Sequence, residues 1–207
     1  IGDNGICKGL RADWNDCLNL GGGESAMVSF LHCWALRQFI ELADFLQRKQ
    51  DVIEFSVILD KTEQKCNEVL WDGDWYIRGI TLDNRKIGSN TNEEGKIHLE
   101  SNVWAVISEA ATPERSEKAM NSVIEKLKTD YGLMLNWPPY TKPDDDIGFV
   151  TRVYPGIKEN GAVFSHPNPW AWAALANIGK GNLAMKMYDQ ICPYHQNAKI
   201  DIRQSEP

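Results

Sequence analysis

The sequence has no pair of cysteines at the close spacing that metal sites and redox motifs use. Its five cysteines, Cys7, Cys17, Cys33, Cys66 and Cys192, are an odd number scattered along the chain, with no Cys-x-x-Cys pair among them. Neither a zinc site nor a disulfide framework is indicated, and no metal is expected. Free thiols persist in a reducing cytosol, so the cysteine usage favours a cytoplasmic protein.

A basic excess and a long apolar run are also missing. The chain carries 22 Lys and Arg against 29 Asp and Glu, for a net charge of −7. Nucleic-acid binders present a basic face, so no nucleic-acid partner is expected. No apolar stretch approaches the roughly 20 residues of a membrane-spanning helix. The first residues lack the charged-then-apolar pattern of a signal peptide, and we expect no membrane partner.

The 207 residues are 43% hydrophobic, which is enough for one domain with a sizeable core. Eight tryptophans and six tyrosines are many for this length. Carbohydrate sites use such rings, although large helical cores use them too. The chain begins with a loop-like stretch at residues 2–5 and stops at residues 205–207 without a closing element. We therefore expect a segment of a larger protein.

Apolar residues recur at three- and four-residue steps through most of the chain, which predicts helices. Asp51 is a candidate N-cap for the second of them, and Thr112 followed by Pro113 is a strong start signal for the fourth. Glycines 179 and 181 separate the last two. The predicted helices cover residues 25–46, 51–70, 99–111, 113–131 and 170–178, and a final one runs to residue 192.

Two regions depart from helical periodicity. Residues 71–80 are expected to form an extended hairpin with 85–88, turning at Asp83 and Asn84. Residues 132–165 are rich in proline and aspartate and read as a long loop, and loops of that length are usually functional. The fold class is therefore mainly all-α. Helix pairs with long loops fit either a toroid of paired helices or a bundle, and periodicity alone does not choose.

The stretch over residues 11–25 carries the clearest chemistry. Asp13 and Asp16 bracket Trp14, and an acid beside an indole is partly desolvated, which raises its pKa and lets it donate a proton near neutral pH. Glycoside chemistry uses an aromatic face and a protonated acid. The alternative is that Asp13 and Asp16 only cap turns and that Trp14 only fills the hydrophobic core. Asp13 is expected to be structural, with Arg11 as its partner or as a clamp for the loop, and the glycines at 21–23 are expected to form a turn before the first helix.

Four blocks in order, RADWNDCLNLGGGES, WDGDWYIRG, EEGKIHLESNVWAV and YPGIKENGAVFSHPNPW, resemble glycoside hydrolase family 94, the inverting disaccharide phosphorylases. The resemblance covers essentially the whole chain. It implies that residues 1–207 are part of an (α/α)6 catalytic barrel, truncated at both ends, with long loops and a short β-hairpin. Family members are longer and commonly form homodimers, so the resemblance implies a homodimer of the whole protein.

The resemblance also implies roles for individual residues. Asp16 matches the general acid, and Trp14 matches a tryptophan that lines the sugar site. Lys158 and Glu159 match residues that touch the acceptor-side sugar. His166 matches a phosphate-binding histidine. No cofactor is implied, because inorganic phosphate is the co-substrate and acts as the nucleophile.

The implied reaction is inverting phosphorolysis of a β-linked disaccharide to an α-sugar 1-phosphate and a free sugar. Val153 falls near a position that the resemblance associates with an N-acetyl group, so N,N'-diacetylchitobiose is the favoured substrate. Cellobiose and cellobionic acid stay open. An inverting hydrolase on a similar toroid and a non-catalytic carbohydrate-binding helical domain are the competing hypotheses. The resemblance also implies that donor-subsite residues and part of the phosphate site fall outside residues 1–207, so the isolated chain is expected to have little or no activity.

Overall fold

A computed structural model of the 207-residue chain describes residues 1–11 and 13–197. The expectation for residues 205–207 lies outside the described residues. The fold is mainly α, as predicted, with a few two-residue strands. The described helices form no closed barrel, so the barrel of the whole protein and the domain limits stay predictions. None of the described helices is long and apolar enough to cross a membrane.

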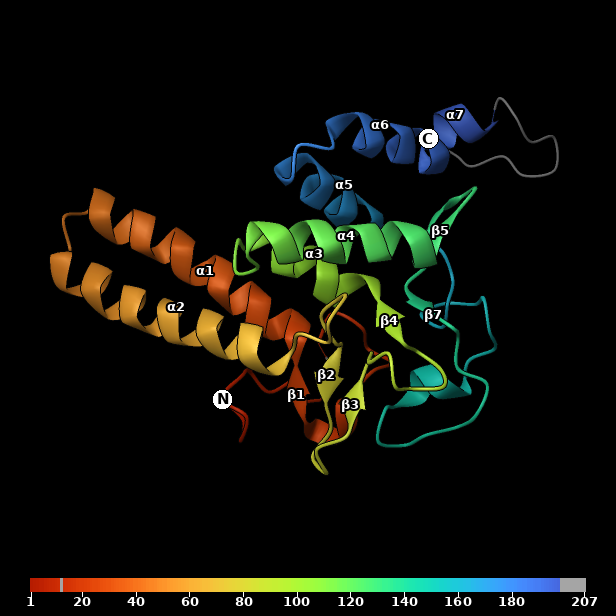
Figure 1. Cartoon of the computed structure of the whole chain (residues 1–207), viewed down its shortest axis with the longest axis horizontal. Coiled ribbons are helices and arrows are strands. Elements are labelled where there is room, and N and C mark those ends of the chain that lie inside the picture. The colour runs from red at the N-terminus through yellow and green to blue at the C-terminus, as the bar shows by residue number, and fades with distance from the viewer. Residues whose placement is uncertain (12, 198–207) are drawn as a thin grey trace.

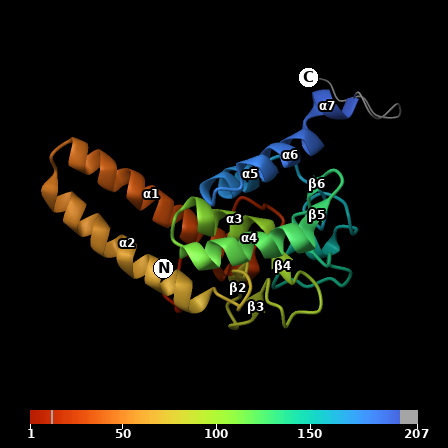
Figure 2. The same ribbon diagram turned by 45° about the horizontal axis from the view of Figure 1, so that its top comes forward.

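Helices α1 (Ala26–Phe45) and α2 (Lys49–Val69) lie side by side and project from the rest of the molecule (Figures 1 and 2). The predicted start of α1 is confirmed, because Ser25 Oγ accepts a hydrogen bond from Val28 N at 3.2 Å. The predicted cap at Asp51 is wrong. Helix α2 begins at Lys49, and Asp51 stands in its first turn, where it pairs with Arg48 Nε at 2.5 Å and faces the positive end of the helix dipole.

Five further helices, α3 to α7, make up the rest of the helical layer (Figure 1). The start signal at Thr112 is confirmed, since its Oγ1 accepts from Arg115 N at 3.3 Å. Helix α3 ends four residues before its predicted end, and Glu109 then takes a left-handed backbone conformation that a helix cannot continue. The bounds are Leu99–Ile107 for α3, Pro113–Leu127 for α4, Asn168–Asn177 for α5, Gly181–Ile191 for α6 and Pro193–Asn197 for α7.

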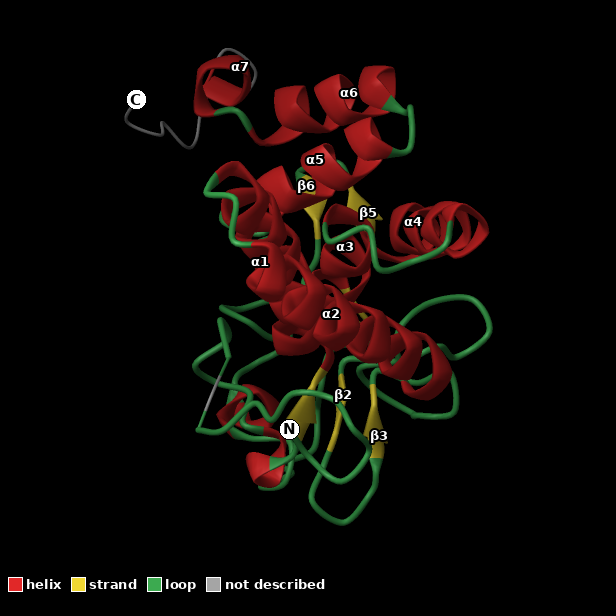
Figure 3. Ribbon diagram, turned by 90° about the vertical axis from the view of Figure 1, so that its left-hand side faces the viewer, coloured by secondary structure: helices red, strands yellow, loops and turns green. Residues whose placement is uncertain are grey.

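The predicted hairpin is confirmed as β2 (Gly79–Ile80) paired with β3 (Lys86–Ile87), seen below the helices in Figure 3. A third strand, β1 (Glu24–Ser25), pairs with β2. Residues 128–133, predicted as the end of a helix and the start of a loop, form a second hairpin. The remaining short elements are β4 (Ile97–His98), β5 (Lys128–Thr129), β6 (Gly132–Leu133), β7 (Asn136–Trp137) and the 3-10 turns η1 (Leu20–Gly22) and η2 (Phe149–Arg152).

Three apolar clusters hold these elements together. The first lies between α1, α2 and the β2 region around Phe30 and Tyr76, and the second lies among α3 to α6 around Val103 and Met120. The third is smaller and contains Leu18, Leu20, Ile87, Tyr140, Ile147 and Val150. This third cluster joins the segment after Asp16 to the long loop 138–152, so it brings distant parts of the sequence together beneath the predicted site.

Candidate active site

Asp13 anchors the segment that contains the predicted general acid. It is buried, and its carboxylate receives two bonds from Arg78, Nη2 to Oδ1 at 2.7 Å and Nη1 to Oδ2 at 2.6 Å. Ser25 Oγ donates to Oδ2 at 2.7 Å, and Asn15 N donates to Oδ1 at 3.0 Å. Because Ser25 also caps α1, this carboxylate ties the segment to the start of the helix and to the residue before β2.

The charge state of Asp13 follows from these partners. Burial alone would raise the pKa of Asp13, but the charge and hydrogen bonds of Arg78 outweigh it and lower the pKa below its usual range. Asp13 is therefore an ionised structural carboxylate. The prediction that Arg11 is its partner is wrong: Arg11 is exposed, and Arg78, 65 residues along the chain, takes that place.

Asp16 is exposed in this chain. The partial desolvation expected for an acid beside the indole therefore falls on Asp13, which the arginine keeps charged, and not on Asp16. The Trp14 ring packs against Phe164, His166 and Trp170. The role of Asp16 as general acid stays a prediction.

Trp14 and His166, 152 residues apart, are in direct contact. Trp14 Nε1 donates a hydrogen bond to His166 Nδ1 at 2.7 Å. The indole also meets the rings of Phe164, His166 and Trp170 edge-on, with centroid separations of 5.4, 5.5 and 5.4 Å. His166 and Trp170 are 5.0 Å apart. The predicted sugar wall and the predicted phosphate ligand therefore form one aromatic cluster at the start of α5.

A row of indoles leads from this cluster into the helical layer. Trp170 meets Trp104 of α3 at 5.5 Å, and Trp104 meets Trp34 of α1 at 6.3 Å between centroids. Trp14, Trp170, Trp104 and Trp34 thus follow one another at close distance. The row packs the loop segment at Trp14 against three helices, and edge-to-face contacts of this kind favour a defined ring orientation.

The loop that carries Lys158 and Glu159 approaches the residue after Asp16. Burial and the Glu159 carboxylate raise the pKa of the Cys17 thiol to about 11, and the Lys158 charge opposes them. Cys17 O accepts from Val150 N at 2.8 Å, which joins the two loops at the backbone. Glu159 Oε2 is buried without a hydrogen-bond partner among the described residues. The predicted acceptor-side pair therefore lies beside the predicted acid's own segment.

Asn160 holds this loop in place. It is fully buried, its Nδ2 donates to Tyr140 O at 2.8 Å and to Val153 O at 2.7 Å, and its Oδ1 accepts from Tyr140 N at 2.7 Å. Lys158 stands exposed at the turn with a left-handed backbone (φ 50°). Val153 is half-buried where η2 ends. The amide of Asn160 thus fixes both ends of the predicted acceptor-side loop.

A buried polar layer lies next to Asp13. Glu100 Oε1 is 3.9 Å from Arg78 Nε, and burial raises the pKa of Glu100 while the Arg78 charge opposes that rise. Burial and the Arg78 charge lower the pKa of His98 to about 3. His98 is therefore neutral, and its Nε2 shares a 3.1 Å hydrogen bond with the Tyr140 hydroxyl. Arg78 is the cation of this layer, and Asp13 is its ionised partner.

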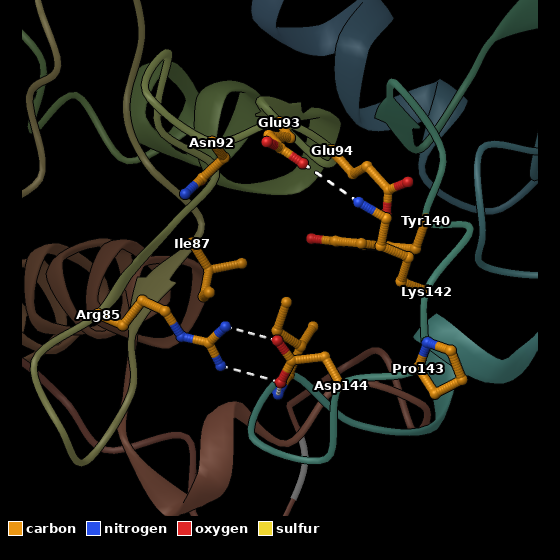
Figure 4. Close-up of a pocket in the computed structure, with 10 residues that line it drawn as sticks. Arg85, Ile87, Asn92, Glu93, Glu94, Tyr140, Lys142, Pro143 and Asp144 are labelled. Atoms are coloured by element: carbon orange, nitrogen blue, oxygen red, sulfur yellow. Dashed lines mark hydrogen bonds and ion pairs between the residues drawn. The ribbon is translucent and has the colours of Figure 1, made fainter.

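A separate pocket of about 340 Å³ opens between the β2–β3 hairpin and the loop around residue 144 (Figure 4). Two ion pairs line it: Arg85 binds Asp144 through Nη1–Oδ2 at 2.5 Å and Nη2–Oδ1 at 2.9 Å, and Lys142 Nζ lies 3.3 Å from Glu93 Oε2. None of the predicted site residues lines this pocket. Its ion pairs fasten the long loop to the hairpin.

Residues 1–207 match the family model of the glycosyl hydrolase 94 superfamily, catalytic domain. The chain belongs to this family. It is 58% identical over 209 residues to N,N'-diacetylchitobiose phosphorylase from Vibrio proteolyticus, an alignment that covers all of this chain and 26% of that protein. It is 35% identical to solabiose phosphorylase from Paenibacillus borealis over 93% of this chain and 26% of that protein. The glycosyl hydrolase 94 chain thus spans about a quarter of the length of these relatives.

Among solved structures, neutral trehalase Nth1 from Saccharomyces cerevisiae matches 77% of this chain and 29% of its own, with a TM-score of 0.54 and 15% identity. At that identity the likeness concerns the fold alone.

Two residues of the candidate site in this glycosyl hydrolase 94 chain were not predicted from the sequence. Arg78 stands between Ile77 and Gly79, and a lone charge inside an apolar extended segment is the signal of a buried partner. Asn160 directly follows the predicted Lys158–Glu159 pair, but an amide among glycines looks like an ordinary turn residue. Only the contacts with distant backbone give it its role.

Proposed function

We propose that the whole protein containing this chain is an inverting disaccharide phosphorylase. Asp16 protonates the bridging oxygen of a β-linked disaccharide, and inorganic phosphate attacks the anomeric carbon from the opposite face. The products are an α-sugar 1-phosphate and a free sugar. The observation that carries this proposal is the 58% identity to an N,N'-diacetylchitobiose phosphorylase along the entire chain.

The geometry supports a phosphorylase over an inverting hydrolase. A hydrolase needs a second carboxylate that activates water on the far side of the sugar ring. Asp13 is committed to Arg78 and buried, so it is not free to act as that base. A phosphorylase needs only one acid together with donors for the phosphate. His166 is exposed and supplies such a donor.

We further propose N,N'-diacetylchitobiose as the substrate, with Val153 near its N-acetyl group. The higher identity to the chitobiose enzyme than to solabiose phosphorylase supports this choice. Cellobiose and cellobionic acid are the alternatives. The five free thiols support a cytoplasmic location. The (α/α)6 barrel and a homodimer of the whole protein complete the proposal, and both rest on membership of the family.

The experiment is a panel of disaccharides with the whole protein, scored as phosphate consumed, with a parallel series from which phosphate is omitted. We expect turnover of N,N'-diacetylchitobiose that depends on phosphate. Product release that continues without phosphate would identify a hydrolase. Binding without any turnover would identify a carbohydrate-binding domain.

Asp16→Asn tests the acid. We expect turnover to fall about a hundredfold to ten-thousandfold, the usual worth of general acid catalysis, while disaccharide binding persists. The control is Asp130→Asn, which changes an exposed acid at the β5–β6 turn in the same way and should leave turnover intact. Unchanged turnover in Asp16→Asn would remove Asp16 from its role.

A further inference from the structure

The contact between Trp14 and His166 restricts where the histidine carries its proton. An indole Nε1–H is a donor and has no lone pair to accept with. At 2.7 Å from it, His166 Nδ1 has to present a lone pair. In a neutral imidazole the proton then sits on Nε2, and the partner of one ring nitrogen sets the role of the other.

We propose that Trp14 is a positioning residue that holds His166 as the Nε2–H tautomer, so that a neutral imidazole N–H donates to the phosphate co-substrate. This inference rests on the proposed function for the identity of the anion. Trp14 thereby has a second task besides forming the sugar wall, and it acts on the phosphate through His166.

The surroundings of the two rings support this arrangement. Trp170 meets both rings, at 5.0 Å from His166 and 5.4 Å from Trp14, and Phe164 meets the other side of the indole. Turning the imidazole over would place a carbon at Nδ1's position and leave the indole N–H facing a C–H group. His166 is exposed, and Nε2 has no hydrogen-bond partner in the part of the chain that the structure describes, so this nitrogen is free for a ligand.

The tautomer matters for the proposed chemistry. A neutral Nε2–H donates a hydrogen bond and keeps its proton. An imidazolium would be an acid next to the nucleophile, and a protonated phosphate attacks less readily than the dianion. If Nδ1 carried a proton, it would also point at the indole N–H, so that two donors would face each other. The Trp14 indole therefore favours a neutral His166, whose Nε2–H orients the phosphate by a hydrogen bond and does not transfer a proton to it.

The direct test is nitrogen NMR of the whole protein labelled with ¹⁵N-histidine, at neutral pH, with His166→Gln used to assign the resonances of His166. We expect Nδ1 of His166 to give the shift of an unprotonated ring nitrogen and Nε2 that of a protonated one. The opposite pattern overturns the proposal. This measurement on the unsubstituted protein needs no variant to fold and no turnover.

The kinetic test compares Trp14→Phe with Trp172→Phe. Only Trp14 donates to His166, whereas Trp172, on α5, packs against Tyr188 at 5.4 Å between ring centroids. We expect Trp14→Phe to raise the KM for phosphate about three- to tenfold, the worth of one neutral hydrogen bond, and Trp172→Phe to raise it less than about twofold. If Trp14→Phe changed only the KM for the disaccharide, Trp14 would contact the sugar without affecting His166, and the proposal would be overturned.

Two substitutions of His166 distinguish the roles of its two ring nitrogens. In His166→Gln the side-chain amide nitrogen lies near the position of Nε2, and in His166→Asn it lies near the position of Nδ1. We expect His166→Gln to keep measurable phosphate dependence and His166→Asn to lose at least tenfold more in phosphate KM. Equal losses, or a smaller loss in the asparagine variant, count against the tautomer. Failure of the proposed function would be visible separately, as absence of phosphorolysis by the unsubstituted protein whatever the NMR shows.

Discussion

At the scale of single residues, the candidate site depends on one buried cation between two buried acids. Arg78 is fully buried, and Asp13 and Glu100 are at most a few per cent exposed. The two acids differ because Asp13 makes two bonds to the guanidinium, whereas Glu100 stands at 3.9 Å from Nε without a hydrogen bond to it. Direct bonds decide which acid stays ionised, and that acid is the one that holds the Trp14 segment.

The first prediction concerns the Asp13–Arg78 pair. Asp13→Asn leaves Arg78 buried without its counter-charge, and breaking a buried pair from one side costs about 3–5 kcal/mol. We expect the free energy of unfolding of the whole protein to fall by that order in urea titrations followed by circular dichroism. Lys142→Ala, which breaks an exposed pair with Glu93, should cost at most about 1 kcal/mol. Equal effects would show that the buried pair is not the anchor described above.

The second prediction is the pH dependence of stability. The pKa of Asp13 is lowered on folding, so its contribution is complete above the unfolded value of about 3.9 and is lost as the pH falls through the folded value. The pKa of Glu100 is raised, so ionising it costs stability as the pH rises above its unfolded value of about 4.3.

Thermal unfolding of Asp13→Asn and Glu100→Gln between pH 3 and pH 8 checks these signs. Relative to the unsubstituted protein, Asp13→Asn should become less stable as the pH rises, and Glu100→Gln should become more stable. Parallel pH profiles for the two variants would contradict the assignment of charge.

At the scale of elements, the start of α1 is held by close backbone packing between β1 and β2. Gly23 precedes β1, and a Cβ atom there would lie 2.0 Å from Ile80 O. The glycine turn predicted for residues 21–23 is present as η1, but its last glycine is required by this approach of two chain segments rather than by the turn. The site segment, β1 and α1 therefore share one tightly fitted junction.

Gly23→Ala tests that junction. We expect it to destabilise the whole protein by about 1–3 kcal/mol, the cost of overpacking, because the atom it meets is backbone and cannot move aside freely. The matched change is Gly181→Ala at the first residue of α6, where nothing lies within 4 Å of the new Cβ. That variant should gain about 0.4–1 kcal/mol. A neutral Gly23→Ala in the same thermal scans would contradict the close contact.

Local signals in the sequence predicted helices α1 to α6 and the β2–β3 hairpin, and the exceptions have physical causes. Periodicity located the helices, and the cap signal at Thr112 located the start of α4. The cap at Asp51 was misplaced because an acid is equally favourable in the first turn, where the helix dipole attracts it. Strand β1 was missed because two residues carry no period. It exists only because Gly79 and Ile80 lie beside it.

At the scale of the whole molecule, the contacts that assemble the site span most of the chain. The Asp13–Arg78 pair is separated by 65 residues, and the Trp14–His166 pair by 152. No local pattern predicts such contacts. The resemblance to the family predicted that Trp14 and His166 belong to one site, but neither it nor the residue pattern predicted that the two touch. The bond between the two rings, and the place of Arg78 beside Asp13, became visible only in the folded chain.

The α1–α2 arm ends in exposed apolar side chains. Phe45 is 83% exposed, and Phe39, Leu42, Ile53 and Val57 are each at least half exposed. Helical periodicity placed Phe39 on the apolar stripe of α1, where burial would be expected. In this chain the far half of the arm has no covering surface among the described residues (Figure 1). Exposed patches of this kind usually mark an interface.

The last prediction concerns the chain on its own. The isolated 207 residues should show little or no phosphorolysis, because the chain spans about a quarter of the length of its relatives and the resemblance to the family implies further site residues outside it. The measurement is phosphate consumption with N,N'-diacetylchitobiose, run beside the whole protein at equal molar concentration. Robust turnover by the isolated chain would show that the site described above is sufficient.

The row of four indoles has an optical consequence. Excitation absorbed by Trp34 or Trp104 can migrate through Trp170 to Trp14, because neighbouring rings are no more than 6.3 Å apart. Trp14 then emits with its ring N–H hydrogen-bonded to the imidazole of His166. An anion that binds Nε2 of His166 should change the fluorescence of all four tryptophans, so intrinsic tryptophan fluorescence should report anion binding at this site.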